Sequence, residues 1–74
     1  MRYFLLVYDR RAARLASAPQ VFDDQKEALR SRFDLERSWP GGDVEVVVLG
    51  GESLESLKTT HARYFANGFL PAAS

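Results

Sequence analysis

The chain has no cysteine and a single histidine, His61. Without cysteine it can form neither a disulfide framework nor a thiolate metal site. A metal site built on one imidazole would need carboxylates to complete it, and the acidic residues are scattered along the sequence. The sequence therefore predicts no metal centre and no cofactor.

An excess of charge of one sign is also absent, because ten lysines and arginines balance ten aspartates and glutamates. A dedicated nucleic-acid-binding protein usually carries a basic excess, as does a polybasic membrane anchor. The apolar run Tyr3–Tyr8 is too short to span a membrane or to form the core of a signal peptide. We expect a cytoplasmic protein without a membrane partner.

Apolar residues make up 46% of the 74 positions, which is enough for one small domain over residues 1–74. The run Arg2–Asp9 is rich in aromatic and branched side chains, which predicts a strand buried on both faces and central in its sheet. Leu15–Phe22 is a weaker strand, and its Pro19 places it at an edge. Val44–Leu49 is the third predicted strand.

Two segments show the periodicity and caps of helices. The first is Asp24–Trp39, with an acidic cap at its start and proline directly after it. The second is Ser53–Ala66, capped by Ser53 or a neighbour. The connection Asp9–Arg14 lacks the Asn-Gly or Asp-Gly of a tight hairpin. It is either a hairpin with a looser loop, which we favour, or a helical turn. Residues 69–74 form an apolar tail.

The element order is therefore β-β-α-β-α, an α+β fold. A first strand buried on both faces predicts a three-stranded antiparallel sheet of order 2-1-3, with both helices on one face. The other face would then expose large apolar side chains of the first strand, which is unfavourable in water. We expect a second copy or another protein to cover it. The tail folding back, or a nucleic acid stacking on the aromatic rings, are the alternatives. The candidate interface residues are Tyr3, Phe4, Leu5, Leu6, Val7 and Tyr8.

Charged or polar side chains interrupt the apolar faces of both predicted helices. Arg32 and Glu36 lie four residues apart in the middle of the first apolar arc, and His61 lies in the second. If the helices pack side by side, these residues could meet as a polar site for acid–base chemistry or for an anion. The favoured interpretation is structural, with an Arg–Glu pair on one helix and a hydrogen-bonded histidine between the helices.

The loop after the first strand is basic. It holds Arg10, Arg11 and Arg14, the candidate contacts for a nucleic acid. Because the chain as a whole is neutral, a solvated turn is the favoured interpretation.

The segments MRYFLLVYDRR, EALRSRFDLE, VEVVVLG and THARYF resemble short uncharacterised proteins of high-GC Gram-positive (actinobacterial) bacteria. This resemblance implies a bacterial cytosolic protein and adds no activity. Many such hairpins carry a glycine in the turn where this chain has Ala12-Ala13.

Taken together, the residues favour a small protein-interaction or regulatory module, not an enzyme, that binds itself or another protein. A nucleic-acid-binding protein that uses the arginine loop is the alternative. A small enzyme or ligand binder built on Glu36 and His61 is a third hypothesis.

Overall fold

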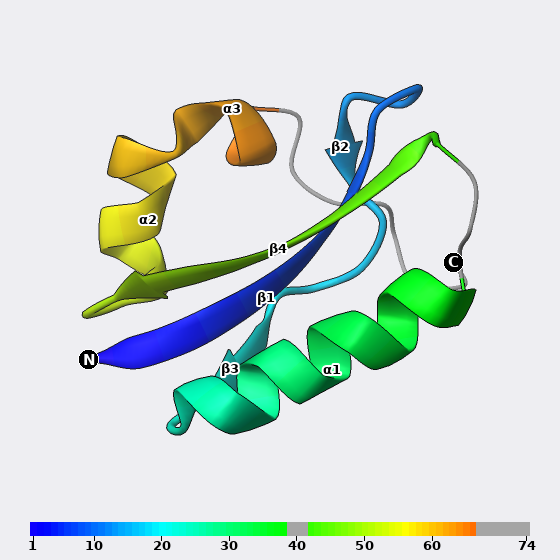
Figure 1. The fold of residues 1–74 in the computed structure, drawn as a ribbon. Coiled ribbons are helices and arrows are strands. Elements are labelled where there is room, and N and C mark those ends of the chain that lie inside the picture. The colour runs from blue at the N-terminus through cyan, green and yellow to red at the C-terminus, as the bar shows by residue number, and fades with distance from the viewer. Residues whose placement is uncertain (39–41, 67–74) are drawn as a thin grey trace.

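The central strand of the sheet is β1 (Arg2–Asp9), as the sequence predicts (Figure 1). In this computed structural model, residues 1–38 and 42–66 are described. The predicted end of the first helix at Trp39 and Pro40, and the predicted tail 69–74, lie outside these residues. β1 is hydrogen-bonded along its whole length to β4 (Val44–Gly51) in antiparallel register, from Arg2 opposite Gly51 to Asp9 opposite Val44.

The opposite edge of β1 is shared by two short strands. β2 (Arg14–Leu15) pairs with the end of β1, and β3 (Gln20–Phe22) pairs with its beginning, both antiparallel. The predicted single strand Leu15–Phe22 is therefore wrong in its continuity. Leu15 lies opposite Tyr8 and Gln20 opposite Leu5, so five steps along the edge match three along β1. Pro19 falls in this break, because proline has no N–H to donate to the ladder.

The helices cover opposite faces of the sheet (Figure 1). α1 (Gln25–Ser38) packs against β1, β3 and β4, whereas α2 (Leu54–Thr60) packs on β4 and α3 (Ala62–Phe65) on β2. The prediction that both helices lie on one face is wrong. The physical reason lies in β1 itself, because a strand that is apolar on both faces needs a layer of helix on each.

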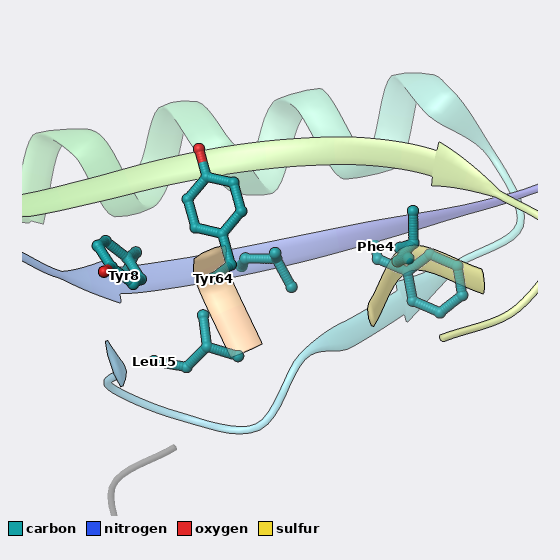
Figure 2. Close-up of a cluster of buried hydrophobic side chains, with 6 residues drawn as sticks. Phe4, Tyr8, Leu15 and Tyr64 are labelled. Atoms are coloured by element: carbon teal, nitrogen blue, oxygen red, sulfur yellow. The ribbon is translucent and has the colours of Figure 1, made fainter. Parts of the chain in front are cut away.

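Alternation along β1 divides the buried side chains between these two layers. Phe4, Leu6 and Tyr8 point toward α2 and α3 (Figure 2). Leu5 and Val7 point toward α1. The first core consists of Phe4, Leu6, Tyr8, Leu15, Leu57 and Tyr64. The second contains Leu5, Val7, Val46 and Ala28. The open apolar face expected from the sequence is thus covered within the chain.

His61 divides the second predicted helix into α2 and α3. Ser53 caps α2 as predicted, and its Oγ accepts a hydrogen bond from the Ser56 N–H at 3.2 Å. At His61 the backbone leaves the helical region, with φ −125° and ψ 50°. The preceding Thr60 hydroxyl donates back to the Ser56 carbonyl and lies 2.9 Å from His61 Nδ1. Such side-chain bonds compete with helix continuation, and the break turns α3 over β2.

The connection after β1 is a hairpin loop, which answers the question left open by the sequence. The Asp9 carboxylate accepts hydrogen bonds from the N–H groups of Arg11 and Ala12, at 2.9 and 3.1 Å. These bonds fold the chain into a local turn. Ala13 then adopts a left-handed conformation with φ 58°, which costs an L-residue about 1–2 kcal/mol.

We expect Ala13→Gly to raise the free energy of unfolding by about 0.5–1 kcal/mol. Glycine adopts positive φ without steric cost, and the gain exceeds its larger loss of entropy on folding. Ala12→Gly is the matched control, because its φ is not positive and only the entropic loss applies there. Urea denaturation of both variants checks this. Equal destabilisation by the two changes would contradict the expectation.

Candidate functional site

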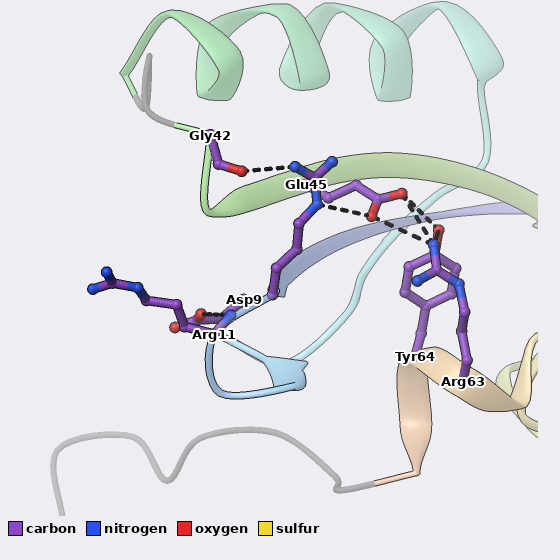
Figure 3. A network of polar contacts seen from close by, with 7 residues as sticks. Asp9, Arg11, Gly42, Glu45, Arg63 and Tyr64 are labelled. Atoms are coloured by element: carbon purple, nitrogen blue, oxygen red, sulfur yellow. Dashed lines mark hydrogen bonds and ion pairs between the residues drawn. The ribbon is translucent and has the colours of Figure 1, made fainter.

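A polar network joins three elements at the hairpin end of the sheet (Figure 3). Its centre is Glu45 on β4, whose side chain is 22% exposed. The Tyr64 hydroxyl donates to Glu45 Oε2 at 2.8 Å, and Arg63 Nη2 lies 3.4 Å from the same oxygen. Arg10 approaches from the loop, with Nε 3.6 Å from Glu45 Oε1. The network therefore ties the hairpin loop and α3 to β4.

Two aromatic rings pack against the residues of this network. The rings of Tyr8 and Tyr64 meet edge to face, with centroids 5.1 Å apart. The Arg63 guanidinium lies 4.3 Å from the Tyr64 ring centroid and donates to the Tyr64 hydroxyl at 2.9 Å. Ring contacts and cation–π attraction both favour this arrangement. Its chemistry is that of a structural clamp, because each polar group already has a partner.

The surroundings of the clamp shift the pKa values of Glu45 and Tyr64 in opposite directions. The hydrogen bond from Tyr64, together with the charges of Arg63 and Arg10, lowers the pKa of Glu45 below its ordinary value of 4.5. Burial, followed by the bond and charge of Glu45, raises the pKa of Tyr64 above 10.0. The folded state therefore favours an ionised glutamate beside a neutral tyrosine.

The lowered pKa of Glu45 predicts a pH-dependent loss of stability on the acid side. Its contribution is fully present above pH 4.5, the ordinary value, and is lost as the pH falls through the lower pKa of the folded state. We expect Glu45→Gln to cost about 1–2 kcal/mol at pH 7 and progressively less as the pH falls below that window. Denaturant melts of both proteins at pH 7 and pH 3 measure this. The same decrease in the free energy of unfolding from pH 7 to pH 3 in parent and variant would contradict this expectation.

The three arginines of the predicted nucleic-acid contact have different surroundings. Arg10 donates to the Gly42 carbonyl at 2.6 Å and pairs with Glu45. The Nε of Arg11 lies 3.3 Å from Asp43 Oδ2. The Nε of Arg14 is buried without a hydrogen-bond partner among the described residues. A phosphate at this loop would compete with carboxylates already beside Arg10 and Arg11.

The three residues of the predicted polar site do not come together. Arg32 and Glu36 form the expected pair on α1, with 3.4 Å between Nε and Oε2. His61 follows α2, on the opposite face of the sheet (Figure 1). The pair is also not buried, because both side chains are 44% exposed. The acid–base hypothesis built on Glu36 and His61 therefore lacks its geometry.

The exposure of the Arg32–Glu36 pair sets the expected effect of Glu36→Ala. Exposed pairs four residues apart on a helix contribute little, so we expect a cost of about 0.2–1 kcal/mol. This is less than a buried pair would give. A urea melt of the variant measures it, with Asp34→Ala, which removes the partner of Arg37 on the same helix, as the control. A loss above about 2 kcal/mol would indicate a buried role.

The outer face of α1 is the feature that sequence reasoning missed. Phe33 is 67% exposed and Leu29 is 37% exposed, whereas Ala28 is the buried residue of this helix. A shallow, open groove of about 520 Å³ lies on this face, and every described residue that lines it belongs to α1. The described residues that line it are Lys26, Leu29, Arg30, Phe33, Asp34 and Arg37. Lys26 and Arg30 have no ion pair among the described residues, while Arg37 pairs with Asp34.

The rotation of α1 leaves Ala28 against the sheet and Leu29 and Phe33 on the outer face. Turning Leu29 and Phe33 toward the sheet would also draw Glu36 and Lys26 into the interface, where charges are costly. With Ala28 against the sheet instead, Arg32 and Glu36 lie at a half-exposed flank. The available signal in the sequence is the charged pair inside the apolar arc, which marks the stripe as unsuited to burial.

Other sites are not apparent in the part of the chain that the structure describes. No group of three or more histidine, aspartate or glutamate side chains there could hold a metal ion. Across residues 1–38 and 42–66, no helix has the length and apolar character needed to cross a bilayer. Comparisons with protein families, with curated proteins and with solved structures found no match.

Proposed function

We propose that this protein is a small protein-interaction module that binds another protein through the outer face of α1. The observation that carries the proposal is Phe33, a large aromatic side chain that lines the groove and is 67% exposed. Exposed apolar side chains gathered in a groove mark interaction sites more often than isolated ones do. A partner that covered Leu29 and Phe33 would remove this surface from water.

This proposal moves the interface from the sheet to the helix. Five of the candidate interface residues are buried in the cores of the chain itself and are each at most 8% exposed: Phe4, Leu5, Leu6, Val7 and Tyr8. The arginine loop is a weaker candidate, because Arg10 and Arg11 already lie beside carboxylates. The outer face of α1 combines apolar side chains with Lys26 and Arg30, two cations that have no ion pair within residues 1–38 and 42–66.

A cytoplasmic location and a role without catalysis belong to the same proposal. The chain has no cysteine, which is in keeping with a reducing compartment. The polar clamp around Glu45 has its groups paired with one another. Cell fractionation tests the location.

Photo-crosslinking tests the interaction. Benzoylphenylalanine would replace Phe33 in the native host, and Thr59, which is exposed on α2, would carry it in the control. We expect an adduct with a defined protein from position 33 and none from position 59. The identified partner, once purified, should bind the parent and lose binding to Phe33→Glu. The same products from both positions, or none from position 33, would contradict the proposal.

A further inference from the structure

We infer that the segment bound by the outer face of α1 is an acidic amphipathic helix of another protein; this rests on the proposed function. The described residues of the groove carry three cations, Lys26, Arg30 and Arg37, against one carboxylate, Asp34. The carboxylate is already paired with Arg37. Lys26 and Arg30 remain without ion pairs among the described residues, so the face presents uncompensated positive charge beside its apolar side chains.

The spacing of these residues suits a helix lying along α1. Leu29 and Phe33 are four apart, and so are Lys26 and Arg30, so both pairs follow the helix axis as adjacent stripes. A partner helix with leucines at helical spacing would bury Leu29 and Phe33. Carboxylates flanking those leucines would meet Lys26 and Arg30. This is the helix-in-groove mode of recognition, with charge setting the choice of partner.

A second copy of the chain fits this face less well. In a symmetric pair the same surface contacts itself, so a face with three cations and one carboxylate among its described residues would meet a second face of the same net positive charge. Like charges in one interface are repulsive, and the single carboxylate of the groove is already engaged. The homodimer expected from the sequence is therefore not favoured at this surface.

An anionic lipid surface would also attract cations, but the face is poorly shaped for it. Large apolar side chains on α1 beyond Leu29 and Phe33 are few, and the same helix carries Asp34 and Glu36. A helix that lies in a bilayer interface needs a broad apolar face. The two-residue stripe inside a groove is better matched to a single helical segment.

Two synthetic 18-residue peptides with the same leucine stripe, flanked by glutamate in one and by lysine in the other, provide the test. Titration into ¹⁵N-labelled protein should shift the amide signals of residues 26–37 with the glutamate peptide. We expect the lysine peptide to bind at least about tenfold more weakly. Added salt should weaken binding of the glutamate peptide, because the charges are exposed.

Charge reversal at the groove provides the matched control. Arg30→Glu should weaken the glutamate peptide at least about threefold. Arg2→Glu, an exposed arginine outside the groove, should leave its affinity unchanged. Equal affinity for both peptides would overturn the inference while leaving the crosslinking result, and hence the proposed function, intact. Tighter binding to phosphatidylglycerol vesicles, shifts outside residues 26–37, or sedimentation of a dimer that Phe33→Glu dissociates would also overturn it.

Discussion

Leu5→Ala and Leu6→Ala are each expected to lower the free energy of unfolding by about 2–5 kcal/mol. The two leucines are neighbours on β1 and point to opposite faces of the sheet. Leu5 points toward α1 and is 1% exposed to solvent. Leu6 points toward α2 and α3 and is 0% exposed. A domain of this size has a total stability of about 4–11 kcal/mol, so either change removes a large part of it.

A large loss of stability from both substitutions is informative. If one face of the sheet were open, the leucine on that face would be exposed, and its replacement by alanine would cost much less than replacement of the other leucine. If one face were covered by a second copy, the cost on that face would depend on protein concentration. We expect both midpoints to be independent of concentration. Urea denaturation at two concentrations at least 50-fold apart (roughly 2.3 kcal/mol in the association term) measures this. Val21→Ala, at a position 51% exposed, is the control and should cost little. A cost below about 1 kcal/mol at either leucine would contradict two-sided coverage.

Tyr64→Ala is expected to cost about 2–4 kcal/mol, because it removes a buried ring from the first core and the donor to Glu45 at the same time. The ring contacts Tyr8, and the hydroxyl donates to Glu45 at 2.8 Å. Loss of this side chain should also release α3 from the sheet. Amide hydrogen exchange in residues 62–66 should then accelerate more than exchange in β1.

Tyr64→Phe separates the two roles of Tyr64. It keeps the ring and removes the hydroxyl, so we expect a cost of about 0.5–1.5 kcal/mol. The decrease in the free energy of unfolding at high pH should also differ between the parent and Tyr64→Phe. The pKa of Tyr64 is raised above 10.0, so its contribution is present below pH 10 and is lost as the pH rises through the higher pKa of the folded state. Tyr64→Phe should lack this alkaline loss. Tyr64→Phe and Tyr64→Ala with equal stability would show that packing of the ring contributes nothing.

The local signals in the sequence were sufficient for β1, β4 and the helix caps. The apolar run Tyr3–Tyr8 gives β1 its central place and its burial on both faces. Asp24 accepts from the Lys26 N–H at 3.1 Å at the start of α1, and Ser53 caps α2. These features depend on a few adjacent residues, which is why short-range patterns predict them.

Features that depend on competition between distant groups were not predicted. The face chosen by α2 and α3 is decided after β4, where nothing in the local pattern fixes the direction of the chain. The break at His61 depends on a threonine side chain competing with the backbone of its own helix. The rotation of α1 depends on weighing exposure of Phe33 against burial of the charged neighbours Glu36 and Lys26.

The most direct test of two-sided coverage with an exposed α1 face is the access of a soluble gadolinium chelate to side-chain NMR signals. The ring of Phe33 and the methyl groups of Leu29 should relax strongly, and the methyl groups of both Leu5 and Leu6 should be protected. Strong relaxation of either Leu5 or Leu6, together with protection of Phe33, would contradict the arrangement and return the interface to the sheet.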